Sequence, residues 1–159
     1  TYTKWILDLR ANDKILNYLN QPKLRVFSQK GPVTPDHVIR IKPKPLILKI
    51  SDKKEEKLNN LIGKEIQKFK NNYHKYFLKN KKYVIKPKEL DLNPRLLLIP
   101  NLGIIGVGRT KKEASIVSDL AECTVDVISK AESIGKFKSI SDKEIFKAEA
   151  SWPIWPGRT

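Results

Sequence analysis

The residues best suited to chemistry lie in the short stretch PDHVIRIKPK, and they are one imidazole and several cations. His37 follows Asp36, and cationic side chains come soon after it. A carboxylate beside an imidazole, with cations nearby, could hold a phosphate or a carboxylate group. The residues predicted to contact a substrate phosphate or an interface are His37, Arg40, Lys42 and Lys44.

The same stretch also has an ordinary structural explanation. Thr34 and Asp36 have side chains that fold back onto backbone amides in turns. They could do so in a loop that precedes a strand, with no ligand involved. The sequence leaves both explanations open.

A second group of candidates follows the glycine-rich phrase GIIGVG. Its glycines at 103, 106 and 108 are not in the GxGxxG order of a dinucleotide-binding loop, so we expect them to serve a β-hairpin. A helix is predicted to begin after Thr110, and its first amides could attract an anion. The candidates for this weak anion site are Arg109, Thr110 and Lys111.

Metal and nucleophile chemistry have few candidates. The chain has two histidines, His37 and His74, which are 37 residues apart, whereas zinc sites need three or four ligands. The single cysteine, Cys123, has no histidine close in sequence and is assigned to the buried stripe of a helix as a small core residue. We therefore predict no metal ligand and no catalytic residue in this chain.

The net charge of +15 first suggests a nucleic-acid partner. Only six of the 32 basic residues are Arg, however, and Arg supplies most bidentate contacts to bases and phosphates. The excess lysines lie mainly between 42 and 88, a segment that is also rich in Asn. An AT-rich genome and a solvated helix face explain this composition, so nucleic acid is not the expected partner. A lysine-rich module that binds RNA or another polyanion remains the alternative.

Apolar spacing predicts the elements of the first half. A helix or helix pair is expected over 3–20, and a short strand over 24–27. Pro32 and Pro35 predict a loop over 28–36, followed by a strand over 37–41. A further apolar run covers 46–50, and a long helix is expected from about 52 to 80.

The second half is predicted to contain a hairpin and two helices. Apolar runs at 95–100 and 103–107 flank Asn101 and indicate a tight β-hairpin. Thr110 with Glu113 forms a capping-box pattern at the start of a helix that runs to about 133. A similar pattern opens a short helix to about 150. This order of elements predicts an α/β domain with a mostly antiparallel sheet flanked by helices.

Length and composition predict one domain over 1–150 and an irregular Trp/Pro tail over 151–159. No apolar run reaches the roughly 20 residues that cross a bilayer, and the first residues lack a secretion signal. The expected location is cytoplasmic. The chain contains no Met, even at position 1, which predicts that it is a fragment of a larger protein.

Four phrases in a fixed order carry a family resemblance. They are PDHVIRIKPKPL at 35–46, YHKY at 73–76, PNLG at 100–103 and the helix over 110–134. Together they resemble the second half of the class II aldolase/adducin-like region in bifunctional rhamnulose-phosphate aldolase/short-chain alcohol dehydrogenase proteins. The resemblance runs from about Lys23 to Glu149, and the sequence after Ala150 departs from it. It implies a three-layer class II aldolase-like domain.

The resemblance also implies where the chemistry of the parent protein lies. Class II aldolases hold zinc with three histidines, from an HxH phrase and an HG phrase, and use it to stabilise an enediolate oxygen. This sequence has no HxH phrase, and Leu102 stands where the HG phrase would supply a ligand. We therefore expect an accessory, non-catalytic half of an enzyme acting on sugars or sugar phosphates. The zinc-dependent retro-aldol site would lie in the N-terminal half.

The same resemblance implies partners and cofactors. The partners would be the N-terminal aldolase half and a C-terminal dehydrogenase domain, and a homo-oligomer is expected. Zinc and NAD(P) would be cofactors of the parent protein, with none held by this chain. The short-chain dehydrogenase signature is absent in context, and we do not expect activity from this chain alone.

Overall fold

The structure is a computed structural model that describes residues 4–51 and 54–151. Its sheet contains β1 (Ile6–Arg10), β2 (Leu46–Ile47), β3 (Leu96–Ile99) and β4 (Gly103–Gly108) in the order β1-β4-β3-β2. β4 pairs antiparallel with both β1 and β3, whereas β2 pairs parallel with β3. The sheet is therefore mixed, and the prediction of a mostly antiparallel sheet is corrected.

The parallel pair follows from the long helix between its two strands. α4 (Glu55–Asn80) and the short helix η1 (Lys81–Tyr83) separate β2 from β3 along the chain. Parallel neighbours need a crossover of a dozen or more residues, which is usually a helix. The predicted order of an apolar run, a long helix and a strand is therefore consistent with a parallel pair.

The first strand replaces a helix that the apolar spacing predicted over 3–20. Ile6, Asp8 and Arg10 are half-buried, while Leu7 and Leu9 between them are exposed. This alternation has the period of a strand with one covered face. Only α1 (Asp13–Leu19) is helical in this range, and it begins at Asn12, whose side chain accepts a hydrogen bond from the Ile15 amide at 2.9 Å.

Two further predictions in the first half were wrong in type. α2 (Leu24–Phe27) occupies the predicted strand, and α3 (Pro35–Ile41) occupies the end of the predicted loop and the second predicted strand. Pro35 lies in the first turn of α3, where a missing amide costs no helical hydrogen bond. Thr34 before it is extended, as a residue preceding a helix should be.

The second half agrees with the sequence-based prediction. The β3–β4 hairpin, α5 (Lys111–Ile134) and α6 (Asp142–Ser151) are all present, and α4 is confirmed as well. Both capping-box residues act at α5: Thr110 Oγ1 accepts from the Glu113 amide at 3.1 Å, and Glu113 Oε2 accepts at 2.7 Å from the amide of Arg109, the residue before the N-cap. The tail predicted over 151–159 lies, apart from Ser151, outside the described residues.

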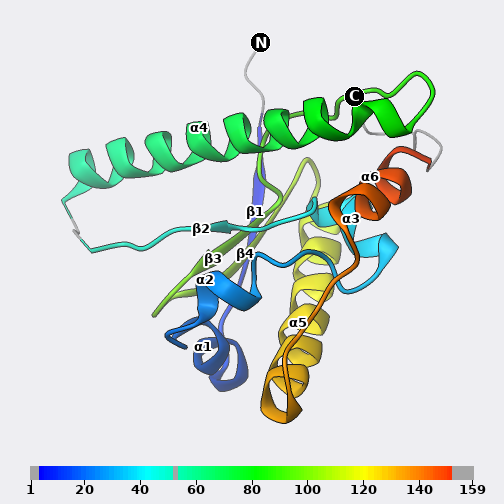
Figure 1. The fold of residues 1–159 in the computed structure, drawn as a ribbon. Helices are drawn as coiled ribbons and strands as arrows, with labels where there is room; N and C mark the ends of the chain where they lie inside the picture. The colour runs from blue at the N-terminus through cyan, green and yellow to red at the C-terminus, as the bar shows by residue number, and fades with distance from the viewer. Residues whose placement is uncertain (1–3, 52–53, 152–159) are drawn as a thin grey trace.

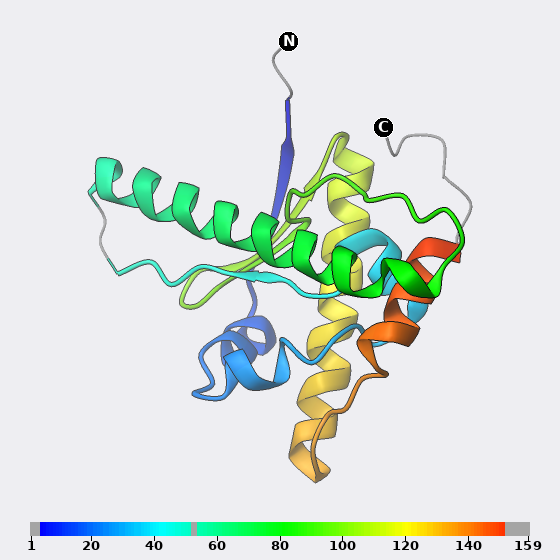
Figure 2. The ribbon, with the colours of Figure 1, turned by 45° about the horizontal axis from the view of Figure 1, so that its top comes forward.

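Helices cover both faces of the sheet, and alternate strand residues divide between them. Leu96, Leu98 and Ile104 join the main core with α1, α2 and α5. Leu97 and Ile105 join a second cluster that includes the α4 side chains Ile62, Ile66 and Phe69. Figures 1 and 2 show the two long helices, α4 and α5, running in different directions with the strands between them. This arrangement has three layers.

The glycines of β4 serve two different purposes. Gly103 has a φ of 147° and belongs to the hairpin, as expected. Gly106 and Gly108 instead lie against α5: a Cβ on Gly106 would lie 2.4 Å from the Ala114 carbonyl oxygen, and one on Gly108 would lie 2.5 Å from the Ala114 amide nitrogen. The phrase GIIGVG therefore lets a helix pack closely on the strand.

Cys123 was assigned to the buried stripe of its helix, and this was wrong. The buried stripe of α5 includes Ala121, Val125 and Ile128, whereas Cys123 is exposed. A residue two positions from both Ala121 and Val125 points to the opposite side of a helix.

Among the described helices, none is long and apolar enough to cross a membrane.

Candidate functional site

The four predicted site residues lie on two consecutive segments. His37 and Arg40 belong to α3, and Lys42 and Lys44 belong to the segment that links α3 to β2. His37 is buried at 3% exposure, and its Nδ1 lies 2.7 Å from Thr34 Oγ1. Arg40 is half-buried, Lys42 is buried and Lys44 is exposed. Their role in substrate or interface contacts stays a prediction.

Burial sets the protonation of His37. Removal from water lowers the pKa of His37, and the Leu120 carbonyl and Asp36 oppose this effect. The neutral imidazole is therefore the form that the folded protein favours. Such a buried ring suits packing of α3 better than direct contact with a ligand.

This lowered pKa predicts a loss of stability in acid. The unfolded chain binds a proton more readily than the folded chain, so the contribution of His37 is present above about pH 6.5 and is lost as the pH falls through the lowered pKa. Urea unfolding at pH 7.5 and pH 5 should show a smaller pH dependence for His37→Gln than for the wild type. His74→Gln is the matched control, because His74 lies on the surface, 2.8 Å from Glu89. If the stability of the wild type and of His37→Gln depended equally on pH, the pKa of His37 would not be lowered by folding.

Lys42 ends α3 in an unusual conformation. Its φ is 67°, a region that non-glycine residues seldom occupy. Its Nζ donates a hydrogen bond to the Asp91 carbonyl and lies 3.8 Å from the centroid of the Tyr73 ring. The carbonyl oxygen and the face of the aromatic ring both attract a cationic head group. Lys42 thus joins α3 to α4 and to the segment before β3.

Tyr73 continues this buried polar cluster toward α6. Its hydroxyl donates to Glu149 Oε1 at 2.5 Å, and Glu149 is buried at 6% exposure. Burial and then Glu149 raise the pKa of Tyr73, and the same two causes raise that of Tyr76. Local sequence patterns give no signal for the contact with Glu149, which is 76 residues from Tyr73 in sequence.

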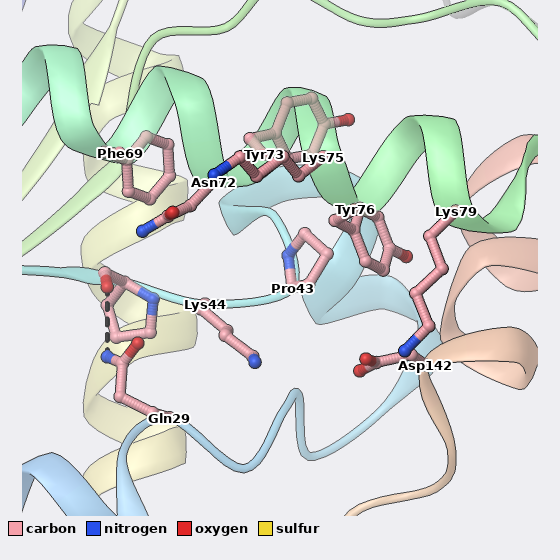
Figure 3. A pocket seen from close by; sticks show the side chains of 11 residues that line it. Gln29, Pro43, Lys44, Phe69, Asn72, Tyr73, Lys75, Tyr76, Lys79 and Asp142 are labelled. Atoms are coloured by element: carbon pink, nitrogen blue, oxygen red, sulfur yellow. Dashed lines mark hydrogen bonds between the residues drawn. The ribbon is translucent and has the colours of Figure 1, made fainter.

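A cavity of about 350 Å³ opens beside this cluster (Figure 3). Four segments line it: the stretch after α2, the end of the α3–β2 link, one face of α4, and the start of α6. Of the predicted site residues, Lys44 lies in its wall. The other polar side chains of the lining were not predicted, and they are Gln29, Asn72, Tyr73, Lys75, Tyr76, Lys79 and Asp142.

The weak anion site at the start of α5 lies elsewhere and is already occupied by side chains. The Glu113 carboxylate accepts the hydrogen bond of the Arg109 amide. The Arg109 guanidinium stacks on Trp5, with 3.9 Å between its Cζ and the ring centroid, and Arg95 approaches the same ring at 4.7 Å. Anion binding by Arg109, Thr110 and Lys111 stays a prediction.

The residues present do not fit a zinc ion. Within residues 4–51 and 54–151, no group of three or more His, Cys, Asp or Glu side chains could hold a metal. His37 is buried against Thr34, and His74 pairs with Glu89 on the surface of α4. Within the described residues, neither histidine therefore has the further ligands that a zinc ion needs.

These features agree with a family match over nearly the whole chain. Residues 1–154 match the family described as aldolase class II, second domain. The chain belongs to this family. It is 27% identical over 153 residues to the uncharacterized oxidoreductase YuxG of Bacillus subtilis, a match that covers 95% of this chain and 22% of YuxG. The chain thus spans about a fifth of that relative.

Two solved structures share the fold. The crystal structure of YgbL from Escherichia coli, a putative aldolase/epimerase/decarboxylase, matches with a TM-score of 0.57 at 12% identity, over 90% of this chain and 56% of YgbL. The Klebsiella pneumoniae protein of the same name matches with a TM-score of 0.52 at 14% identity, over 82% of this chain and 51% of that one. The class II aldolase-like region expected from the four phrases is confirmed.

Proposed function

We propose that this chain is the accessory, non-catalytic half of a class II aldolase/short-chain dehydrogenase that acts on sugars or sugar phosphates. In this proposal the zinc-dependent retro-aldol site belongs to the preceding half of the same polypeptide. The match to a second domain supports this division, as does the chain's coverage of 56% of YgbL and 22% of YuxG. Homo-oligomerisation, a downstream dehydrogenase domain and NAD(P) belong to the same proposal.

The observation that carries the proposal is the uncovered edge strand β1. In the described part of the chain, β1 pairs on one side with β4 and forms an edge of the sheet. Leu7 and Leu9 on this strand are 62% and 53% exposed. An apolar edge strand is a template for further pairing, and soluble proteins normally cover or charge it. We infer that the preceding half covers it.

The apolar surface at this edge continues the covered face of the sheet. Leu9 pairs with Ile105, and Leu7 pairs with Val107. Directly opposed residues of antiparallel strands point to the same face. Ile105 packs in the cluster formed with α4, so the leucines extend this face beyond the part that α4 covers. A domain placed beside α4 would bury both leucines.

The test is a double substitution in the full-length protein. Leu7→Lys/Leu9→Lys should lower aldol cleavage by about tenfold or more and raise hydrogen exchange in β1, because lysines do not enter an apolar interface without a large cost. Ile85→Lys/Ile134→Lys is the matched control, since both isoleucines are 91% exposed and neither belongs to a strand of the sheet. Equal activity and exchange in the two double variants would refute the docking of the first half at this edge.

A separate measurement tests the location of the zinc ligands. In the full-length protein, His37→Ala and His74→Ala should leave the zinc content unchanged by elemental analysis. Loss of zinc in either variant would place a ligand in this chain and would overturn the non-catalytic assignment.

The alternative function, binding of RNA or another polyanion, is favoured by one observation. Lysines are concentrated on the exposed part of α4 and on η1, including Lys64, Lys68, Lys79 and Lys81. Phosphate contacts by lysine would make such binding strongly dependent on salt. Retention on immobilised RNA at about 50 mM salt, lost at higher salt, would support this alternative. No retention would remove it.

A further inference from the structure

The cavity between α4, α6 and the α3–β2 link has the character of a ligand site. Its volume of about 350 Å³ lies within the range of small-molecule pockets. Its walls come from parts of the chain that are far apart in sequence, represented by Gln29, Lys44, Asn72 and Asp142. A hollow of this size at the meeting point of four segments can surround a small molecule from several sides.

The charge around the cavity favours an anion. Lys44, Lys75 and Lys79 line it, against one carboxylate, that of Asp142. These lysines make no hydrogen bond or ion pair with any residue that the structure describes, whereas Lys130 and Lys147 pair with neighbouring carboxylates. Figure 3 shows Lys79 descending from α4 toward Asp142 and Lys44 reaching into the same space from the opposite wall. A phosphate group could accept hydrogen bonds from both sides.

The rest of the lining suits a polyol. Phe69 and Tyr76 give the cavity aromatic walls, which pack against the C–H faces of small ligands. Asn72, Gln29 and Asp142 supply amide and carboxylate groups that can bond hydroxyls. The cavity thus combines lysines that suit a phosphate, amides that suit hydroxyls, and aromatic walls. This combination matches a phosphorylated polyol better than a bare anion.

The walls are held in place before any ligand arrives. Lys44 lies between Pro43 and Pro45, whose rings fix the backbone on both sides of it. Gln29 Nε2 donates to the Pro45 carbonyl at 3.1 Å and fastens this wall to the segment after α2. On the opposite side, the Tyr76 ring packs edge-on against Phe146 of α6, with 5.7 Å between centroids. A preformed site loses less entropy on binding.

We propose that this cavity binds a small phosphorylated polyol through its phosphate group. Lys44, Lys75 and Lys79 contact the phosphate, while the amides and Asp142 contact hydroxyls. The site belongs to the second domain itself and does not depend on the proposed function, because none of its residues comes from the preceding half. A polyanion such as RNA is the competing occupant, and it would use lysines across the basic surface of α4 as well as those that line the cavity.

The test measures binding of glycerol phosphate, inorganic phosphate and glycerol by calorimetry, first to the 159-residue chain and then to the full-length protein. Glycerol phosphate should bind in the range of about 1 mM or tighter, inorganic phosphate more weakly, and glycerol not measurably. Lys75→Gln/Lys79→Gln should weaken binding of glycerol phosphate by about tenfold. Lys44→Gln, from the other wall, should weaken it in the same direction.

The matched control is Lys64→Gln/Lys68→Gln. These lysines have the same spacing on the same helix and the same exposure class, but they do not line the cavity. The control should bind glycerol phosphate as the wild type does. Equal weakening in both double variants would assign binding to the basic surface and would overturn the proposal. Absence of saturable binding in both the chain and the full-length protein would overturn it too, as would glycerol binding as tightly as its phosphate.

Discussion

Gly106→Ala is expected to lower the free energy of unfolding by about 3 kcal/mol, the upper end of the usual cost of overpacking a core. A Cβ at this position would lie 2.4 Å from the Ala114 carbonyl oxygen and 2.4 Å from Ser118 Oγ. The carbonyl belongs to the backbone of α5, so it cannot give way unless the helix moves. Ser118 is fully buried, and its hydroxyl donates to the Asp8 carbonyl at 3.2 Å. The substitution therefore disturbs the contact that holds α5 on β4 and β1.

Gly63→Ala is the matched control for Gly106→Ala. Gly63 lies within α4, and a Cβ there would meet nothing within 4 Å. Alanine in a helix interior is favoured over glycine, so this variant should be more stable than the wild type by up to about 1 kcal/mol. Urea unfolding of both variants measures the contrast. A Gly106→Ala protein as stable as the wild type would show that α5 does not pack this closely on β4.

Tyr73→Phe is expected to lower the free energy of unfolding by about 2 kcal/mol. The substitution removes the hydroxyl that donates to the buried Glu149 carboxyl group at 2.5 Å and keeps the ring under Lys42. Hydrogen bonds to charged groups contribute about 1.5–3 kcal/mol, and this substitution removes one such bond from a buried acceptor. We expect α6 to separate from α4 more readily in this variant than in the wild type. Faster hydrogen exchange of the α6 amides would show this.

Tyr83→Phe is the control for the loss of a phenolic hydroxyl. Tyr83 is 39% exposed and contacts the ammonium groups of Lys82 and Lys143 through its ring. Its substitution should change the free energy of unfolding by less than about 0.5 kcal/mol, as surface changes usually do. If Tyr73→Phe had no more effect than Tyr83→Phe, the buried cluster would not fasten α6.

Local sequence signals predicted the elements whose cause is local. The β3–β4 hairpin follows from two apolar runs around Asn101, which adopts a φ of 64°. The start of α5 follows from Thr110 and Glu113, whose side chains satisfy amides at and just before the first turn. The long apolar stripe of α4 was also visible, because its period repeats over 26 residues.

Elements whose form depends on distant neighbours were not predicted. The apolar residues of 6–10 fit a helix or a strand about equally well in so short a segment, and pairing with β4 decides for the strand. The prediction of a loop at Pro35 was wrong because proline also favours the first turn of a helix, where it lies in α3. The parallel pairing of β2 could have been inferred from the long helix that follows it.

The candidate site shows the same limit. The stretch with the four predicted site residues lies beside the buried cluster and the cavity, since Lys42 contacts Tyr73 and Lys44 lines the cavity. The sequence could not show that His37 turns into the core or that Glu149 meets Tyr73 from another helix. Tyr73 and Glu149 are 76 positions apart, so no local pattern in the sequence indicates their contact.

The central claim is that this chain is the second half of a larger enzyme and docks through β1. The most direct measurement is the experimental structure of the full-length protein with zinc bound. The account predicts that the preceding half covers Leu7 and Leu9 at the edge of the sheet. It also predicts that every zinc ligand lies outside this chain. A structure in which Leu7 and Leu9 are both exposed to solvent, or in which His37 or His74 binds the zinc, would contradict it.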